Sequence, residues 1–577
     1  MKKEFYKNLK SKTLNDIATG KITYDKLDDI LREDKEIVLE AIRHESFVYY
    51  DVPDILKDDR EIVLASLKKY GLMLEFVSDK LKKDREIVFT AVKQCGFALK
   101  YADKIFKEDK EIVYEAIKSD GWALQFVGRK FFDIVLYLPL AIPTYIMAFT
   151  YADILSFTGP LQVFFRKNFD SISDFVNHDY MQVEILGLLM GLALYPYVYS
   201  VCRVSFSLIG SNYINLSKNL GLSMTKTFFK VILPLSSPAI ISGLFLVIME
   251  VLNEYGAVKY FGVNTYTSGI FRAYGSMGDV GAAIQLSVLL LFVVLLFMYI
   301  ERKYHSRFKF YYSSNSKIQK LSILEKKNYL LSIVVCFVPF LLGFLIPFLF
   351  IVSNIFLTYN QIDFLDLIEL TLNSVSVSTL ASVIVVLVVL FFLIVEKFTK
   401  SSFNRYISEV ISLGYAVPGA VIGLGLIILF TTIDRSQSSI VFYGSFFVLI
   451  YAYVVRFLAV GKSPIKSSLE KHPESYDQTA KNLGLGPFNL LKKIHIPINK
   501  FAIVTALIVT FIDLLKELPI TLILRPFNFD TLATQTYEFA IEEMIPMSAA
   551  YSFIIIVIGS FLLIILKNSI NKQINVS

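Results

Sequence analysis

The chain has 577 residues, of which 54% are hydrophobic and 19% are charged, and its formal net charge is +7. With a mean hydropathy of +0.54, it is too apolar for an ordinary soluble protein. Its three cysteines form no CxxC pattern, which argues against a disulfide scaffold or a thiolate metal site. The N-terminal residues contain no apolar core of signal-peptide length, so no cleavable signal is expected.

Residues 1–128 predict a soluble array of α-helical repeats. The pattern DxEIV recurs every 25 residues, beginning at Asp34, Asp59, Asp84 and Asp109. Each Asp can cap a helix with one apolar face, and the Gly that follows twelve residues later in three of the four repeats can end it in a left-handed turn. Stacked helical hairpins of this kind bury a core that no single repeat could form. The array resembles an uncharacterised bacterial repeat family, and we expect either a partner-binding module or a spacer.

From Ile134 onward, long apolar runs predict an all-α, polytopic membrane domain. Ten runs have about the 20 residues needed to cross a hydrocarbon core. They lie near 134–152, 185–204, 239–261, 282–300, 331–357, 374–395, 411–430, 440–458, 501–524 and 549–566. We therefore expect two related halves, of four spans at 132–303 and six spans at 329–570, joined by a cytoplasmic linker at 304–328.

The loops between these runs alternate in charge. Two loops, 156–181 and 525–548, have few basic residues and several acids. The other set is rich in Lys and Arg and comprises 203–230, 301–327, 396–405, 456–500 and 567–577. Basic loops remain on the cytoplasmic side of a membrane. The bias therefore predicts a multi-pass protein with the repeats and both termini in the cytoplasm.

One short pattern occurs twice, 263 residues apart. The copies are NLGLSMTKTFFKVILPLSSPAI from Asn219 and NLGLGPFNLLKKIHIPINKFAI from Asn482. Each has a glycine break and ends with a proline that suits the first turn of the apolar helix after it. The pattern resembles the EAA loop of permease subunits of binding-protein-dependent ABC importers, although the glutamate of that motif is replaced by Asn215 and Gln478.

This resemblance implies that each copy docks onto an ATPase subunit. The docking residues that it implies are Asn215, Gly221, Phe228, Val231 and Pro234 in the first copy, and Gln478, Ala480, Gly484, Leu491, Ile494 and Pro497 in the second. The alternative is an amphipathic linker that lies on the membrane surface. Two copies in register favour docking.

Ionisable residues follow each copy at the same offset. The offset pairs Glu250 with Asp513, Asn253 with Lys516, and Glu254 with Glu517. Carboxylates at i and i+4 project from one helix face, and a charge at membrane depth is costly unless it meets water or a partner. These six residues are the candidate translocation path: Glu250 and Asp513 would face each other near mid-membrane across a pseudo-two-fold axis, and Glu254 and Glu517 would form an outer ring. The alternative is local pairing of Asp513 with Lys516.

Several longer segments resemble the ferric-iron subfamily of these permeases. They are LPLAIPTYIMAFTYADILSFTGPLQ from Leu138, LNEYGAVKYFGV from Leu252, GIFRAYGSMGD from Gly269 and DLLKELPITLILRPFNFDTLATQTYE from Asp513. The resemblance covers about 132–570 and implies import of Fe(III) from a periplasmic binding protein across the bacterial inner membrane. Ferric iron, a hard cation, suits carboxylate and phenolate oxygens.

Two alternatives stay open from the sequence. The substrate could be sulfate, thiamine or another small solute. The chain could also be a decayed permease that anchors the repeats as a scaffold, because the family usually has six spans per half and the first half here has four.

Several chemistries lack their signatures. The chain contains no GxxxxGK[ST] motif, so ATP is expected only on a partner ATPase, which would act as a homodimer. No nucleophile or metal-hydrolase signature is present either. We expect no enzymatic activity, no bound cofactor, no dedicated metal site and no nucleic-acid partner.

Overall fold

The computed structural model divides into two compact units, Met1–Asp133 and Ile134–Ser577. The structure describes residues 2–576 apart from 45, 104, 108, 121–131, 133, 169–178, 210, 308–325, 400–409, 412, 437–440, 471–474 and 483–485. The part that it describes contains helices and no strand, which confirms the predicted all-α class. Each unit has its own buried hydrophobic core.

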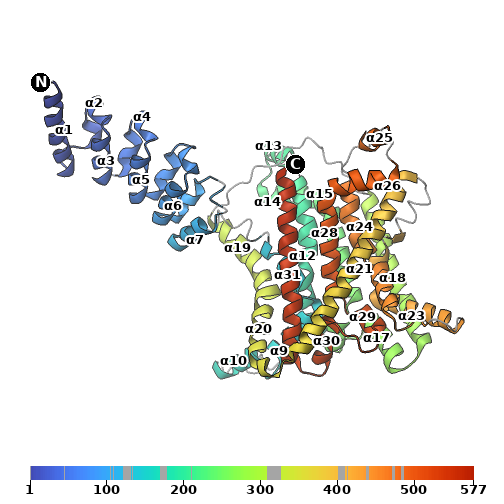
Figure 1. The fold of residues 1–577 in the computed structure, drawn as a ribbon. Helices are drawn as coiled ribbons and strands as arrows, with labels where there is room; N and C mark the ends of the chain where they lie inside the picture. The colour runs from blue at the N-terminus through green and yellow to red at the C-terminus, as the bar shows by residue number, and fades with distance from the viewer. Residues whose placement is uncertain are drawn as a thin grey trace. The chain divides into compact units, whose positions relative to one another are not determined.

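The first unit is a stack of short helices, which confirms the predicted repeat array (Figure 1). Its longer helices are α1 (Lys2–Ala18), α3 (Lys35–His44), α5 (Arg60–Lys69), α6 (Arg85–Gln94) and α7 (Lys110–Ser119). Each packs against the next in chain order. The side chains of Asp59, Asp84 and Asp109 accept hydrogen bonds from backbone N–H groups two and three residues later, as capping requires.

The glycines of the repeats have a different role from the predicted one. Gly71 and Gly96 do not have positive φ. They follow the extended C-cap residues Tyr70 and Cys95 and begin the 3-10 helices η3 (Gly71–Phe76) and η5 (Gly96–Lys100). A Cβ at either glycine would collide with a backbone carbonyl of the next repeat, that of Ala91 or Ala116. Close packing between repeats, and not a left-handed turn, therefore requires glycine here.

A ladder of ion pairs connects successive repeats. The basic residue after each capping Asp reaches the capping Asp of the next repeat and the Glu two positions beyond it. The pairs are Lys35 with Asp59 and Glu61 (2.8 and 2.9 Å), Arg60 with Asp84 and Glu86 (3.3 and 2.6 Å), and Arg85 with Asp109 (3.4 Å) and Glu111. Lys10 of α1 makes the same pair of contacts with Asp34 and Glu36, both at 2.8 Å. Helix α1 therefore acts as the first repeat although it lacks the DxEIV pattern.

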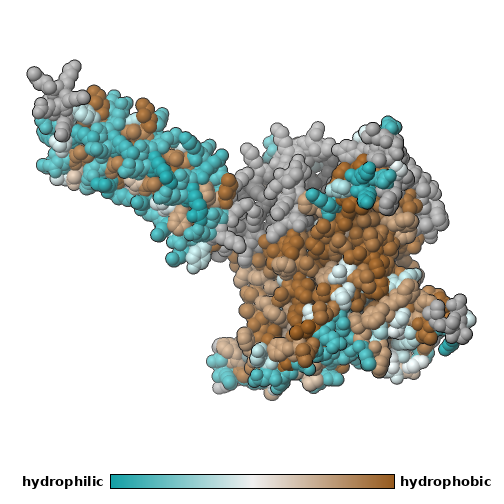
Figure 2. All heavy atoms as spheres, in the orientation of Figure 1, coloured by the Kyte–Doolittle hydropathy of each residue, from teal (hydrophilic) through white to brown (hydrophobic). Residues whose placement is uncertain are grey.

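The second unit is a bundle of apolar helices. Among the residues that the structure describes, eight helices are long and apolar enough to span a membrane, and a bent pair makes a ninth if it is counted as one span. The spans are α12 (Val183–Leu208), α15 (Leu233–Asn253) with the residues from Met224, α18 (Val280–Arg307), α19 (Lys326–Phe340) continuing into α20 (Ile346–Thr358), α21 (Phe364–Thr399), α23 (Gly419–Ser436), α24 (Phe446–Leu469), α31 (Ile545–Val576), and the pair ending in α28 (Lys500–Leu515). Figure 2 shows the broad hydrophobic band that they form.

The expected ten spans are therefore too many for the residues that the structure describes. The run 134–152 is the one that fails, because it is interrupted by Pro139 and Pro143, which break helices. It forms a 3-10 turn, η7 (Leu138–Ala141), followed by α9 (Thr144–Leu155) of only 12 residues.

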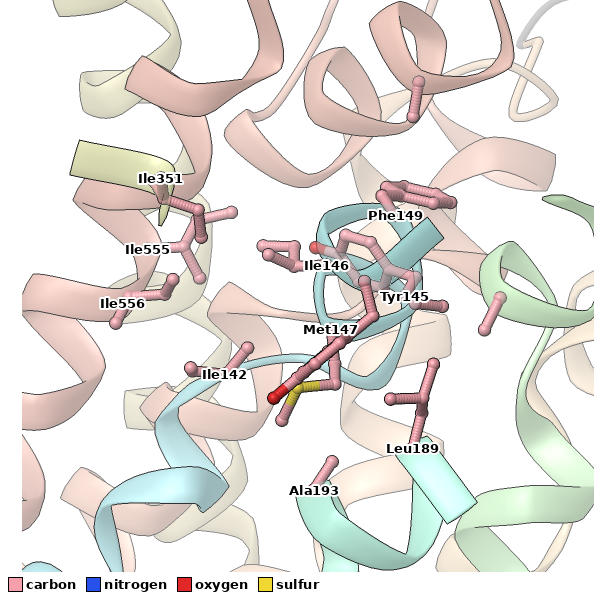
Figure 3. Packing of buried hydrophobic residues seen from close by; sticks show 14 of the residues in the cluster. Ile142, Tyr145, Ile146, Met147, Phe149, Leu189, Ala193, Ile351, Ile555 and Ile556 are labelled. Atoms are coloured by element: carbon pink, nitrogen blue, oxygen red, sulfur yellow. The ribbon is translucent and has the colours of Figure 1, made fainter. Parts of the chain in front are cut away.

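Helix α9 is a core element instead of a lipid-facing one. Its residues from Tyr145 to Ala152 are all buried. Figure 3 shows these side chains among residues of three other spans: Leu189 and Ala193 of α12, Ile351 of α20, and Ile555 and Ile556 of α31. The loss of length does not remove α9 from the fold, because the surrounding helices enclose it.

The two halves of this unit repeat one packing scheme. Helix α12 packs against α15 as α24 packs against α28. The short helices match in the same way. Helix α16 (Gly256–Tyr260) packs on α9, and its counterpart α29 (Pro519–Leu524) packs on α23. Helix α17 (Tyr266–Phe271) packs on α18, and its counterpart α30 (Leu532–Ile541) packs on α31. Helices α17 and α30 both begin in a capping box, at Thr265 and Thr531. Helix α21, which covers α24 and α28, belongs to the second half alone.

Candidate functional site

The two copies of the repeated pattern lie at one end of the membrane unit (Figure 1). The first forms α13 (Ser211–Asn219) and α14 (Met224–Thr227); the second forms α25 (Ser475–Asn482) and α26 (Pro487–Leu490). Gly221, between α13 and α14, has φ of 76°, which only glycine adopts without strain. Gly484 and the side chain of Ala480 lie outside the described residues.

Each copy contains a π-helical turn at the same offset. These turns are η9 (Phe228–Ile232) and η14 (Leu491–His495), a feature that the sequence did not predict. Pro234 then lies in the first turn of α15, and Pro497 in the first turn of α27 (Ile496–Ile498), as expected. The copies differ beyond this point. The first continues into its span, whereas the second is bent by 70° before α28.

The apolar side chains of the two copies are unequally exposed. Phe228 and Phe229 are 38% and 60% exposed, whereas Val231, Leu491 and Ile494 are half-buried. The polar residues Asn215 and Gln478 are exposed. At these positions the first copy therefore presents two exposed aromatic side chains, where the second has Leu491 and Lys492.

All six residues of the candidate path line one buried cavity of about 60 Å³. Glu250, Asn253 and Glu254 come from the end of α15, and the residues at the 263-residue offset come from the end of α28. The predicted convergence of the two halves is thus present in the structure. A cavity of this size has room for a bare ion or a few water molecules.

The two outer glutamates do not lie within the spans, as the expected runs 239–261 and 501–524 had placed them. Helix α15 ends at Asn253 and α28 ends at Leu515, so Glu254 and Glu517 lie just beyond the ends of these helices. Glu250 lies in the last turn of α15, remote from the docking end, and not midway along a longer span.

Glu254 and Glu517 lie beyond the helix ends because they also bond to the start of the helices that follow. The Glu254 carboxylate accepts a hydrogen bond from the N–H of Ala257 (3.0 Å), and that of Glu517 accepts one from the N–H of Ile520 (3.2 Å). These bonds satisfy the first N–H groups of α16 and α29, which would otherwise be unpaired. Each glutamate therefore lies between two helices and bonds to the first turn of the second one, at the same position in both halves.

Arg456 is the principal site residue that the sequence interpretation missed. The expected span 440–458 and the basic loop 456–500 overlap at this residue; in the structure it lies inside α24 and its side chain is 3% exposed. Its guanidinium donates to the Asn253 side-chain oxygen (2.7 Å) and lies 3.7 Å from Glu517. That same oxygen accepts from the N–H of Gly419 (2.7 Å). Asn253, from the first half, is thereby bonded to two residues of the second. The available signal was a lone arginine in an apolar run.

The remaining charged groups are also paired. Lys516 lies 2.9 Å from Asp513, so the local pairing offered as an alternative does occur, but inside the cavity. The hydroxyls of Tyr415 and Thr144 donate to Glu250 and Glu254, respectively. Tyr145 and Tyr197 line the cavity as well, and these phenols were not predicted.

The lining combines four carboxylates with two basic groups, a formal excess of two negative charges. Among the residues with a described position, no group of three or more His, Cys, Asp and Glu side chains is arranged to hold a metal ion. Carboxylate and phenol oxygens of this kind can contact a hard cation.

Comparisons with known proteins agree with this arrangement. A family described as a binding-protein-dependent transport system inner membrane component matches residues 122–309 and 393–574. A family described only as a domain of unknown function, DUF4116, matches three overlapping segments, 34–82, 59–107 and 84–132.

Relatives with assigned names are transport permeases. The chain is 24% identical to the Fe(3+)-transport system permease protein FbpB 2 of Haemophilus influenzae, over 76% of this chain and 83% of that protein. It is 28% identical to the sulfate transport system permease protein CysT of Salmonella typhimurium, over 24% of this chain and 47% of the relative. A putative 2-aminoethylphosphonate permease of Salmonella paratyphi A is 23% identical over 28% of this chain and 60% of its own length.

The two family matches together cover more than half of the chain, and each spans one of the halves that meet at the cavity. The chain therefore belongs to the family of binding-protein-dependent transport system inner membrane components, with two copies of that domain in one polypeptide.

Proposed function

We propose that this chain is the permease of an ATP-binding-cassette importer that passes Fe(III) from a periplasmic binding protein into the cytoplasm. The observation that carries the proposal is the cavity between the halves, where Glu250, Asp513 and four further ionisable or polar residues converge with a formal excess of negative charge. A separate ATPase dimer supplies the energy through the two docking copies. The cell inner membrane is the site of action.

The cavity's charge favours a cation over an oxyanion. Sulfate or a phosphonate would meet four carboxylates in a low-dielectric site, where like charges repel strongly. Carboxylate and phenol oxygens are the ligands that hard cations prefer. The sulfate and phosphonate permeases also align with only about a quarter of this chain, whereas the Fe(3+) permease aligns with about three quarters.

The orientation follows from the docking copies. If α13–α14 and α25–α26 meet the ATPase, their end of the bundle is cytoplasmic, as are both termini. The opposite end, which carries α17, α29 and α30 (Figure 1), then receives substrate from the binding protein.

A decayed permease is a less suitable interpretation. Both halves keep the same helix packing, the same capping boxes and the same π-turns. The first half lacks a counterpart of α21, yet its residues Glu250 and Asn253 still reach the shared cavity.

Uptake of radioactive iron tests the proposal. A strain that lacks this gene should take up iron slowly, and the wild-type gene should restore the rate. The E250Q/D513N variant should restore little uptake while inserting normally, because the amides keep the shape of the side chains and lose their charge. The matched control is Glu184→Gln, an exposed acid at the start of α12 outside the cavity. Normal iron uptake with the double variant, or restored uptake of sulfate but not of iron by the wild type, would refute the proposal.

A further inference from the structure

Lys516 lies in a cavity whose lining is rich in oxygen atoms. Its ammonium lies 2.9 Å from the Asp513 carboxylate, and the two side chains are only 19% and 11% exposed. Glu250 and Tyr197 line the same cavity. One positive group thus shares this cavity with two carboxylates, one from each half, and with a phenol.

The other basic group of the cavity is already engaged. Arg456 bonds to Asn253 and faces Glu517. At the 263-residue offset, the counterpart of Lys516 is Asn253, which is neutral and serves as the partner of Arg456. Lys516 is therefore the cation that balances Glu250 and Asp513.

We propose that Lys516 is a tethered counter-ion for the cation path: its ammonium fills a transient cation site formed by Asp513, Glu250 and Tyr415, and the transported cation displaces it. The identity of that cation as Fe(III) rests on the function proposed above. The displacement itself rests only on the geometry of Lys516.

The physical need for such a group follows from the burial of the site. Two buried carboxylates without a counter-charge would be strongly destabilised or would take up protons. A lysine can supply the counter-charge and still withdraw, because its ammonium is carried on a flexible four-carbon stem. Lys516 is the C-cap of α28, so its stem is not confined within a helical turn.

The chemistry of the remaining ligands defines the class of cation. When the ammonium withdraws, Asp513 and Glu250 offer carboxylate oxygens and Tyr415, which already contacts Glu250, offers a phenol oxygen. The formal charge of the whole lining changes from minus two to minus three, which matches a trivalent ion. All of these donors are oxygens, which hard cations prefer.

Terbium(III), a hard trivalent cation whose emission is sensitised by nearby tyrosine, is a direct probe. The purified full-length chain should bind it weakly, and K516Q should bind it at least tenfold more tightly with stronger tyrosine-sensitised emission. Adding E250Q and D513N to K516Q should abolish this gain, and adding Y415F should reduce the emission. The matched control is Lys259→Gln, an exposed lysine of α16, which should bind as the wild type does.

Two further variants keep the outcome decisive. K516R retains the charge and should bind no more tightly than the wild type, and K516M should reproduce K516Q if the latter assembles poorly. Equal terbium affinity in the wild type, K516Q and K516M would overturn the proposal. If K516Q gains terbium affinity but the wild-type gene restores no iron uptake, Lys516 is the counter-ion and iron is not the transported cation. If iron uptake is restored but no variant gains terbium affinity, the proposed import of iron is supported and the proposed role of Lys516 is refuted.

Discussion

The two halves of the membrane unit share a scaffold but differ in the charges that they bring to their common cavity. Equivalent glutamates, Glu254 and Glu517, begin equivalent short helices. At the neighbouring position the first half has Asn253 and the second has Lys516, and Arg456 comes from the second half alone. A second lysine in place of Asn253 would lie against Arg456, and two buried like charges repel. The difference shows how a duplicated fold yields one asymmetric site instead of two copies of a symmetric one.

The comparison requires that both docking copies face the same side of the membrane. In a variant without native cysteines, a cysteine at Asn215 or Gln478 should stay unlabelled by an impermeant thiol reagent added outside cells. A cysteine at Glu542, after α30, should be labelled fully. The difference in labelling between the two sides should be close to all-or-none. Labelling of only one docking position would mean that the halves are inverted relative to each other.

Breaking the link between the halves should have the largest energetic effect. Arg456→Ala leaves Glu517 as a buried charge without its nearest cation and removes one of the two donors to Asn253. Loss of one partner of a buried pair costs about 3–5 kcal/mol, so the thermal midpoint in detergent should fall steeply. Arg435→Ala removes an exposed arginine from the last turn of α23 and should change little. Equal stability of the two variants would show that Arg456 does not connect the halves.

A smaller effect is expected from replacing Gly221, which has a positive φ in the first docking copy. Gly221→Val places a branched side chain at φ of 76°, at a cost of about 1–3 kcal/mol, and should reduce co-purification of the ATPase. Gly425→Val in α23 is the control, because a Cβ there meets no atom within 4 Å. Undiminished ATPase binding by the Gly221 variant would indicate that this turn is not part of the interface.

The smallest effect concerns the repeat unit. Burial by itself raises the pKa of the Asp59 carboxyl, but hydrogen bonds from Lys35 and from the N–H groups of Glu61 and Ile62 outweigh it, so the net pKa is lowered. A carboxyl with a lowered folded pKa stabilises the fold above its unfolded pKa, about 3.9, and loses that contribution as pH falls through the folded value.

Residues 1–133 should therefore lose stability below about pH 4. At neutral pH, Asp59→Ala should cost about 1 kcal/mol through loss of the cap, measured by urea unfolding followed by circular dichroism. Asp58→Ala, at an exposed neighbouring acid that does not cap α5, should cost less. Equal losses for the two variants would argue against the capping role.

Internal repetition explains which features the sequence could predict. The 25-residue period located the caps, and the 263-residue offset brought together Glu250 and Asp513, because equivalent positions of related halves meet near their common axis. The 263-residue offset could not reveal Arg456, because the first half has no basic residue at the equivalent position. Its depth also depends on where α24 begins, at Phe446, which hydropathy places only loosely.

Helix ends and local backbone conformation were the weakest predictions. The run 134–152 has the composition of a span, and only the effect of Pro139 and Pro143 on the backbone shortens it to α9. The π-turns within both docking copies carry no signal in the amino-acid composition. The role of Gly71 depends on the carbonyl of Ala91 in the following repeat, a contact that becomes visible only once the repeats are stacked.

The ion-pair ladder of the first unit has a consequence for how such a chain can change in length. Each basic residue of the ladder pairs with acids 24 and 26 positions later. Duplicating or deleting any block of 25 residues therefore recreates every ion pair at the new junction. A deletion of 24 or 26 residues would instead set each base at the junction beside the wrong acid and turn one helix relative to the next. The array is therefore free to grow or shrink by whole units through unequal recombination, without any compensating substitution.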